Sequence, residues 1–243
     1  MAPQVLFIYN DPIAPEALLG EVFAERGFDI DTFNVVPTDQ IGDPAAVTVN
    51  FPDPTRYDVV VPLGSRWSVY DDALRAGWVD DEMAVVRKAI DAGVGVLGVC
   101  FGGQLVAQAL GGSVQKAPVP ELGWYDITTQ RPDLIPAGPW FEWHSDQFIP
   151  PPGATELAAT PQAVQAFVLG SALALQFHPE LNLPLLDAWL HDDKGDDGDI
   201  GRLRIDIDEL RARTRAEQAG ATDRLRQLVA RFLDDVARPR SQS

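Results

Sequence analysis

The sequence contains a single cysteine, Cys100, and only three histidines, His144, His178 and His191, among 243 residues. One cysteine excludes an internal disulfide and a zinc site built from several cysteines, and it fits a reducing cytoplasm. With so few imidazoles, the candidates for a general base near neutral pH are few.

Basic side chains are also scarce. The 19 Lys and Arg residues stand against 36 Asp and Glu, which gives a formal net charge of −17. Nucleic acids and anionic membrane surfaces are bound through basic patches, so this balance argues against either as a partner.

The sequence lacks a long run suited to lipid. Residues 92–115 and 157–179 contain no Asp, Glu, Lys or Arg, but the first contains seven glycines and both contain three glutamines, which is not typical of a lipid-facing helix. Residues 4–10 have no basic segment before them and are too short for a secretory signal. We therefore expect a soluble, cytoplasmic protein, and 46% hydrophobic residues are enough to bury one sizeable core.

Short apolar runs alternate with segments of helical spacing through the first 110 or so residues. This alternation predicts an α/β fold with an open, mostly parallel sheet flanked by helices. After Gly112, short strand-like pieces separated by Pro and Gly predict an antiparallel or mixed continuation of the sheet. The predicted strands are 5–9, 29–35, 57–63, the run that ends at residue 99, 113–117, 124–129, 140–144, 147–149, 155–159, 164–169 and 172–177. The predicted helices are 14–26, 80–92, 104–110, 183–190 and 202–237, with a loop at 37–55.

The central apolar run ends in a Gly-x-Cys-x-Gly pattern around Cys100, and helical spacing follows from Gln104. A strand that turns sharply into a helix needs small residues around the strained turning residue, and Gly98, Gly102 and Gly103 provide them. Such an elbow exposes the sulfur at a helix N-terminus, where the helix dipole favours the thiolate. The pattern predicts a nucleophile elbow. The alternative is that Cys100 is a small buried hydrophobic residue.

A second chemical group follows the apolar run 172–175, where His178 is succeeded two residues later by Glu180. A base and the carboxylate that orients it can be supplied in this way. In an open α/β sheet the ligand binds at the carboxyl ends of the strands. Because Cys100, His178 and Gly64 each lie just past the end of a predicted strand, we expect them to converge.

These two motifs resemble the triad type of class I glutamine amidotransferases. Gly-Val-Cys-Phe-Gly-Gly-Gln at 98–104 and Phe-His-Pro-Glu at 177–180 are most similar to the stand-alone proteins akin to the glutaminase part of GMP synthase. The resemblance covers most of the chain and implies a flavodoxin-like sheet. It also implies that Cys100 is the nucleophile, His178 the base and Glu180 the group that holds the imidazole. We expect no cofactor and no metal.

Further pocket residues follow from the elbow and from the resemblance. Attack by a thiolate generates an oxyanion that needs two donors, expected from the backbone N–H of Phe101 and from Gly64 in a neighbouring strand-end loop. The family commonly has Gly-Gly-Pro there, whereas this chain has Leu63-Gly64-Ser65, and a plain turn glycine is the alternative. By resemblance Gln104 lines the substrate pocket; alternatively it caps the first turn of its helix.

Residues 141–146 resemble a Ser-His-Gly-Asp segment that, in the family, helps to hold the α-amino and α-carboxylate groups of glutamine. His144 and Asp146 match this pattern, whereas Trp143 and Ser145 replace the serine and the glycine. The resemblance makes His144 a candidate substrate-binding residue, and the replacements bear on which substrate is bound.

The Glu-Leu-Gly-Trp run that begins at Glu121 resembles a segment near the pocket in the stand-alone proteins. Glu121 is therefore a candidate partner for a substrate amine, with an exposed loop carboxylate as the alternative. Trp124, in the same run, is equally well explained by packing.

An acidic run at 192–199 separates the last predicted helices. In the register of an EF-hand loop starting at Asp193, Arg204 occupies the twelfth position, where a bidentate glutamate is required, so a solvated acidic loop is preferred to a calcium site. That loop is also a candidate to cover the site. We expect an amidotransferase-like domain over residues 1–191, with residues 192–243 forming the acidic loop and C-terminal helices that pack on the same domain.

The expected activity is glutaminase-type hydrolysis of a γ-glutamyl amide through a cysteine thioester, releasing ammonia for a partner synthetase subunit. The alternative is a stand-alone γ-glutamyl peptidase or hydrolase that uses the same three residues, and a non-catalytic binding domain is a third reading. The ligand is expected to be glutamine or another γ-glutamyl small molecule. No phosphate-binding glycine loop and no nucleotide-pyrophosphatase motif is found in the sequence, so the synthetase half of such a reaction is expected on another chain.

Overall fold

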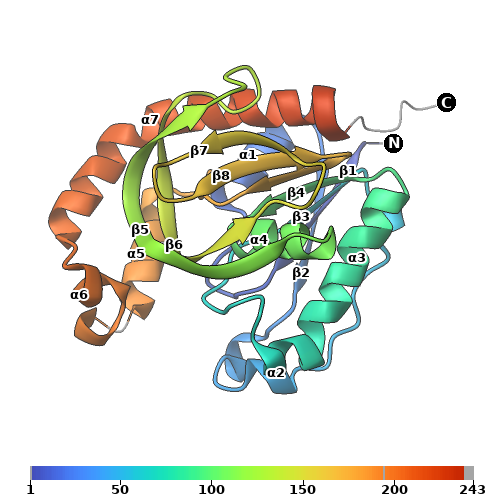
Figure 1. Ribbon diagram of the computed structural model, residues 1–243, viewed down its shortest axis with the longest axis horizontal. Helices are drawn as coiled ribbons and strands as arrows, with labels where there is room; N and C mark the ends of the chain where they lie inside the picture. The colour runs from blue at the N-terminus through green and yellow to red at the C-terminus, as the bar shows by residue number, and fades with distance from the viewer. Residues whose placement is uncertain (1, 194, 238–243) are drawn as a thin grey trace.

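The computed structural model describes residues 2–193 and 195–237. These residues form a nine-stranded sheet with helices on both faces (Figure 1). Lys194 of the acidic run and residues 238–243 of the C-terminal segment lie outside the described residues. None of the helices in the described ranges is long and apolar enough to cross a membrane.

Five strands form the parallel half of the sheet: β1 (Gln4–Tyr9), β2 (Asp29–Asn34), β3 (Val59–Pro62), β4 (Gly95–Val99) and β9 (Ala172–Leu175). β3, β4 and β9 are buried over their whole length. Their sequences are continuous apolar runs because both faces of a parallel sheet are covered by helices. β2 lies at the edge of the sheet and is mostly exposed.

The other half is antiparallel and consists of four strands: β5 (Ser113–Thr129), β6 (Gly138–Ile149), β7 (Thr155–Ala159) and β8 (Val164–Leu169). The complete order is β2-β1-β3-β4-β9-β8-β7-β5-β6. β9 joins the two halves, since it pairs in parallel with β4 and antiparallel with β8. This arrangement confirms the expected mostly parallel sheet with a mixed continuation.

The pieces predicted at 113–117 and 124–129 are one long strand, β5, so the predicted break between them is wrong. Pro118 and Pro120 suggested a loop, but the register between β5 and β6 shifts just before Glu121. A β-bulge of this kind accommodates residues that cannot donate to the ladder without ending the strand. The two pieces predicted within β6 are likewise continuous.

The helices are α1 (Ala17–Glu25), α2 (Asp72–Leu74), α3 (Asp80–Asp91), α4 (Phe101–Ala109), α5 (Leu183–Asp192), α6 (Asp199–Leu203) and α7 (Ile207–Arg231). α1 and α7 cover one face of the parallel half, and α3 and α4 cover the opposite face (Figure 1). Alternate residues of β1 enter the two layers, with Phe7 in the first and Ile8 in the second, as the two-residue repeat of a strand requires. The sequence missed α2 and the π-helical turn Arg75–Val79 that follows it.

The single helix predicted at 202–237 is wrong, because the chain breaks between α6 and α7. Arg204 adopts a left-handed conformation with φ of 56° and ends α6. The carboxylate of Asp206 then accepts hydrogen bonds from two backbone N–H groups in the first turn of α7, which is the usual role of an N-cap aspartate.

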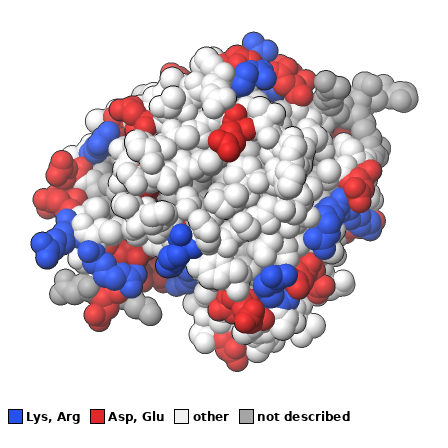
Figure 2. All heavy atoms as spheres, viewed as in Figure 1, with Lys and Arg blue, Asp and Glu red and all other residues white. Residues whose placement is uncertain are grey.

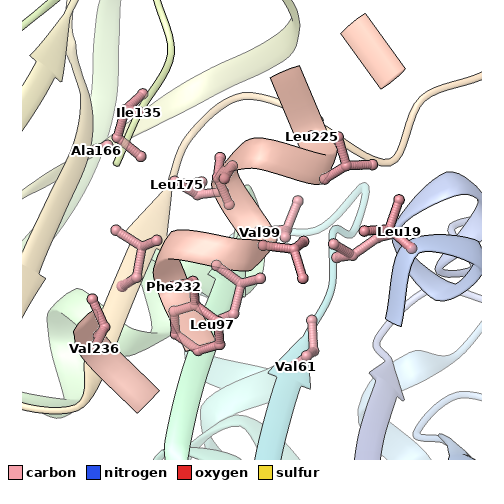
Figure 3. Packing of buried hydrophobic residues seen from close by; sticks show 14 of the residues in the cluster. Leu19, Val61, Leu97, Val99, Ile135, Ala166, Leu175, Leu225, Phe232 and Val236 are labelled. Atoms are coloured by element: carbon pink, nitrogen blue, oxygen red, sulfur yellow. The ribbon is translucent and has the colours of Figure 1, made fainter. Parts of the chain in front are cut away.

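The last described segment completes the first core layer. After α7, the π-helical turn Phe232–Ala237 places Phe232 and Val236 in the same buried cluster as Leu97 and Val99 of β4 (Figure 3). Residues beyond 191 therefore share a core with the sheet. The division at residue 191 itself stays a prediction.

Charged side chains are unevenly spread over the surface. In the view of Figure 2 they lie mainly around the margin, where basic and acidic groups are interleaved, and uncharged atoms cover most of the centre. This face therefore presents no continuous basic patch of the kind that nucleic acids need.

Candidate active site

Cys100 lies at a sharp turn between β4 and α4. Its φ of 52° and ψ of −109° fall outside the regions that non-glycine residues normally occupy. The neighbouring glycines are needed because a Cβ on Gly98 would lie 2.5 Å from the Gly102 carbonyl oxygen, and a Cβ on Gly102 or Gly103 would overlap the carbonyl oxygen of Pro62 or Leu175. The predicted elbow is therefore present.

A cavity of about 290 Å³ opens over this turn, and Cys100 lines it. The residue is only 5% exposed, so the sulfur is more enclosed than an elbow alone suggested. The Sγ atom lies 4.0 Å from the backbone oxygen of Trp143 and 3.8 Å from Nε2 of Gln176. Cys100 is thus buried, as the alternative reading held, but it is buried at a cavity and not within a uniformly apolar core.

His178 and Glu180 meet Cys100 at the same end of the sheet. Nδ1 of His178 lies 2.7 Å from Oε1 of Glu180, and the imidazole also interacts with the side chain of Cys100. A Cβ on Gly64 would lie 3.2 Å from Cε1 of His178 and 3.8 Å from Cβ of Cys100, so the loop after β3 touches both side chains. The backbone N–H of His178 donates to the Phe141 oxygen, which fixes the position of the imidazole against β6.

The proton on His178 is held by two negative neighbours. Burial on its own lowers the pKa of His178, but the charges of Glu180 and of a Cys100 thiolate outweigh burial and raise the pKa well above 6.5. The arrangement favours an imidazolium beside the sulfur, and this is the form that can give a proton to a leaving amine.

Gly64 and Phe101 both adjoin Cys100, Gly64 from the loop after β3 and Phe101 as the next residue in the chain. Gly64 lines the cavity, and Phe101 is the first residue of α4. Among the residues that the structure describes, no hydrogen-bond acceptor is assigned to the backbone N–H of either residue. The N–H of Gly102 is different, because it donates to the Leu63 oxygen at 3.1 Å.

Gln104 and His144 line the cavity, and Glu121 does not. Nε2 of Gln104 donates to the Asp146 oxygen at 3.2 Å and to Oε1 of Gln176 at 3.3 Å, so its amide holds the pocket wall and does not cap α4. Glu121 is 1% exposed and lies in β5 behind His144, 3.2 Å from its Nε2 atom. It is neither at the pocket surface nor an exposed loop carboxylate.

His144 is held between acceptors on both sides of its ring. Nδ1 lies 2.9 Å from the Asp146 backbone oxygen, and Nε2 faces Glu121 and, at 3.4 Å, Oε2 of Glu142. A ring with acceptors at both nitrogens must donate from both, which is the charged form. Burial alone lowers the pKa of His144, but the hydrogen bonds to Glu121 and Glu142 outweigh it and raise the pKa to about 10.

The sequence interpretation missed Glu142. Its side chain is fully buried, and burial raises its pKa to about 7. The spacing of Glu142 and His144, two residues apart in one strand, is the signal that could have placed both on the same face.

The rim of the cavity combines loops from distant parts of the chain. Arg66 binds Asp11 through Nε at 2.6 Å and Nη2 at 3.0 Å, and its Nη1 atom binds Asp192 at the end of α5. Nε1 of Trp143 donates to Asp199 at 3.1 Å. The segment around the acidic run therefore forms one wall of the cavity, a role that the sequence interpretation raised for the loop without naming contacts. In the described ranges, no group of three or more His, Cys, Asp or Glu side chains is arranged to hold a metal ion.

A further buried carboxyl lies behind the loop that carries Gly64. Glu82 of α3 is fully buried, and its carboxyl faces the side chain of Asn10, although neither carboxyl oxygen makes a regular hydrogen bond within the described part of the chain. Burial raises the pKa of Glu82 to about 8. This carboxyl is therefore mostly neutral at pH 7.

The raised pKa of Glu82 predicts that stability falls as the pH rises. A folded-state pKa of about 8 against an unfolded value of 4.5 means that its contribution is complete below pH 4.5 and is lost as pH rises through 8. Glu82→Gln cannot ionise. We expect its free energy of unfolding, relative to that of the wild type, to be about 2 to 4 kcal/mol larger at pH 9 than at pH 5. Urea unfolding at both pH values measures this difference. Asp81→Asn, an exposed neighbour on α3, is the matched control; an equal gain in both variants would contradict the prediction.

Comparison with known proteins places these features in context. The family model described as glutamine amidotransferase class-I matches residues 68–193, a range that contains Cys100, His178 and Glu180 but not Gly64. A subunit of the glutamine-hydrolyzing GMP synthase of Sulfolobus acidocaldarius is 34% identical over 134 residues, covering 51% of this chain and 68% of that protein. The glutamine-hydrolyzing GMP synthase of Nitrosomonas eutropha is 32% identical over 161 residues, covering 54% of this chain and 31% of that protein. The chain thus spans about a third of the longer relative.

Two solved structures share the fold over nearly the whole chain. A glutamine amidotransferase of Thermotoga maritima superposes with a TM-score of 0.81 at 24% identity and covers 97% of this chain and 100% of its own. A glutamine amido transferase of Methylobacillus flagellatus gives a TM-score of 0.82 at 21% identity, covering 97% of this chain and 96% of its own. The expected fold is confirmed.

Proposed function

Because the chain belongs to the class-I glutamine amidotransferase family, we propose that it hydrolyses the side-chain amide of glutamine through a thioester on Cys100 and releases ammonia. The observation that carries the proposal is the junction of three elements at one cavity: Cys100 on a strained elbow, His178 after β9, and Glu180 bonded to His178. A nucleophile, a base and an orienting carboxylate in this relation form the usual triad of acyl transfer.

In the first half of the proposed reaction, the sulfur of Cys100 attacks the amide carbon of the glutamine side chain. The carbonyl oxygen becomes an oxyanion, for which the N–H groups of Phe101 and Gly64 are the proposed donors. His178 carries the proton of the thiol and gives it to the departing nitrogen, so the carbon–nitrogen bond breaks and ammonia leaves. Glu180 accepts a hydrogen bond from Nδ1 of His178 during both steps and so holds the imidazole in place.

In the second half, water attacks the γ-glutamyl thioester. His178, now neutral, takes a proton from the water and returns it to the sulfur as the carbon–sulfur bond breaks, which yields glutamate and the free thiol. Gln104 and His144 line the cavity beside Cys100, and we propose that they contact the substrate. Both ring N–H groups of His144 are engaged by protein acceptors, so what it would offer a carboxylate, such as the one on the α-carbon of glutamine, is the positive charge of the ring.

We also propose that the ammonia is used by a synthetase on another chain. The support is the name of the Sulfolobus acidocaldarius relative, which is one subunit of a glutamine-hydrolysing synthase. Under this proposal the acceptor is a separate protein, and turnover of glutamine by this chain alone is slow until that protein is bound.

A γ-glutamyl peptidase or hydrolase is the second candidate. It is favoured by one specific feature, the wall of the cavity. Trp143 stands where the family pattern has serine, and it is tied to Asp199 of the segment that forms the wall. Such a wall changes which γ-glutamyl compounds can bind next to the same three catalytic residues.

The proposal predicts that the purified chain converts glutamine to glutamate and ammonia in equal amounts. Protein quenched in acid during turnover is expected to carry a γ-glutamyl group on the peptide containing Cys100, which mass spectrometry detects. Asparagine, one methylene shorter, is the matched substrate control and is expected to react at least about 10-fold more slowly. Absence of both turnover and adduct, with and without a co-purifying synthetase, contradicts the proposal.

A panel of γ-glutamyl dipeptides separates the two candidates. Turnover of glutamine alone that rises when a synthetase partner is added supports the amidotransferase. Cleavage of several γ-glutamyl dipeptides by the chain alone, at rates equal to or above that of glutamine, supports the hydrolase.

A further inference from the structure

Asn10 is a fully buried polar residue that follows β1 and does not line the cavity. Its Nδ2 atom donates to the backbone oxygen of Leu63 at 3.1 Å. A buried amide is expensive to keep in the fold unless its hydrogen bonds serve the structure. The structural role of Asn10 therefore depends on the other contacts of the Leu63 oxygen.

The Leu63 oxygen accepts two hydrogen bonds from two different elements. One comes from Asn10, and the other comes from the N–H of Gly102 in α4 at 3.1 Å. In a trans peptide the C=O and the N–H point in opposite directions. Fixing the Leu63 oxygen toward Asn10 and Gly102 therefore turns the N–H of Gly64 away from them, on the side of the peptide that lies at the cavity.

Glu82 faces Asn10 without a regular hydrogen bond to it. Both oxygens of its carboxyl and the Oδ1 atom of Asn10 lack a regular hydrogen-bond partner among the described residues, and the Asn10 amide is the polar side chain that faces the carboxyl. A neutral carboxyl carries an O–H that can donate to an amide oxygen. Such a bond leaves the Nδ2 atom of Asn10 directed at Leu63.

We propose that Asn10, held by Glu82, is a positioning residue that orients the Leu63–Gly64 peptide so that the Gly64 N–H serves the oxyanion. The inference rests on the proposed function, since it concerns the thioester chemistry at Cys100. Asn10 touches neither the sulfur nor the cavity, so its effect passes through the peptide bond. The Leu63–Gly64 peptide also binds the N–H of Gly102, which joins the loop after β3 to the elbow. This bond fixes the distance between the two proposed donors, the N–H groups of Gly64 and Phe101.

The test compares kinetics that need an oxyanion with kinetics that do not. For Asn10→Ala we expect kcat for glutamine hydrolysis to fall about 10- to 100-fold, somewhat less than the loss of a whole oxyanion donor, with KM changed by less than about threefold. Alkylation of Cys100 by iodoacetamide passes through no oxyanion and is expected to keep its rate within about twofold. Ser171→Ala, which also loses a side-chain bond to a backbone oxygen but at the opposite end of β4, is expected to leave both rates as in the wild type.

Glu82 supplies a second pair of variants in case Asn10→Ala does not fold. Glu82→Met keeps the volume and removes the polar contact, so kcat is expected to fall about 3- to 10-fold, whereas Glu82→Gln retains a donor for Asn10 and is expected to keep most of kcat. Equal kcat in Glu82→Met and Glu82→Gln, or a kcat within twofold of wild type in Asn10→Ala, overturns the inference. A parallel fall in alkylation and hydrolysis also overturns it, because that result shows a general distortion of the elbow. A wild type that is alkylated but never turns glutamine over refutes the proposed function instead, and this inference with it.

Discussion

Replacing Cys100 by alanine is expected to abolish glutamine hydrolysis, with kcat reduced by about four powers of ten or more. The covalent route has no other nucleophile, since Cys100 is the only cysteine in the sequence, and the losses from removing a triad nucleophile are of this size. Ammonia release measured at saturating glutamine gives kcat, and the melting temperature of the variant shows that the fold persists.

The triad also predicts how the reductions in kcat of single variants combine in a double variant. Cys100, His178 and Glu180 act as one unit, so Cys100→Ala combined with His178→Asn is expected to be no slower than Cys100→Ala alone. Ser171→Ala is the control for substitution at a partly buried hydrogen bond remote from the cavity. More than about one per cent of wild-type activity in Cys100→Ala would contradict the assignment of the nucleophile.

Replacing Gly102 by alanine is expected to destabilise the protein by about 3 kcal/mol or more. A Cβ at this position would overlap the backbone oxygen of Pro62 and would lie 3.1 Å from the Cβ of that residue. Gly102 belongs to α4 and Pro62 to β3, and both elements are packed, so neither residue can move without shifting the elbow or the loop after β3. Urea unfolding measures the change as a lower midpoint at constant m-value.

Gly42→Ala is the matched control for this prediction. A Cβ at Gly42 would have no atom within 4 Å, and the residue does not have a left-handed φ. Its free energy of unfolding is expected to stay within about 0.5 kcal/mol of the wild type. Equal stability of the two variants would show that α4 and β3 are not as closely packed as the structure has them.

The parts of the fold that the sequence predicted are those with strong local patterns. β1, β3 and β4 are continuous apolar runs, and α1 and α3 have clear helical spacing, so they were found within a few residues of their ends. β5 was predicted as two pieces because Pro118 and Pro120 are strong local signals for a loop. Pairing with β6 across a bulge outweighs that signal, and only the tertiary structure contains it.

In the candidate site, too, the residues with a local sequence pattern were predicted and those defined by distant contacts were not. The glycines around Cys100 and the His178–Glu180 spacing are local, and the structure has these side chains at one cavity. Asn10 and Arg66 could not be recognised, because their meaning depends on partners that lie far away in the sequence. Asn10 is 53 residues from Leu63, and no spacing rule links them.

Glu121 shows the limit of resemblance to a family. The similar segment indicated closeness to the pocket, and the side chain does contact a pocket residue, His144. Burial in β5 turns it toward that histidine instead of toward the cavity. A single sequence does not show which face of a half-buried strand meets a ligand.

The wall that α5, Asp193 and α6 contribute has a consequence for how this protein can diverge. Bond breaking is assigned to residues between Gly64 and Glu180, whereas Asp192, Asp199 and Arg202, which border the same hollow, come later in the chain. Exchanges in that later stretch can change which compounds enter while the reacting groups keep their places. Part of the selectivity is therefore encoded after the residues that carry the chemistry, and that part can vary while the reacting groups are kept.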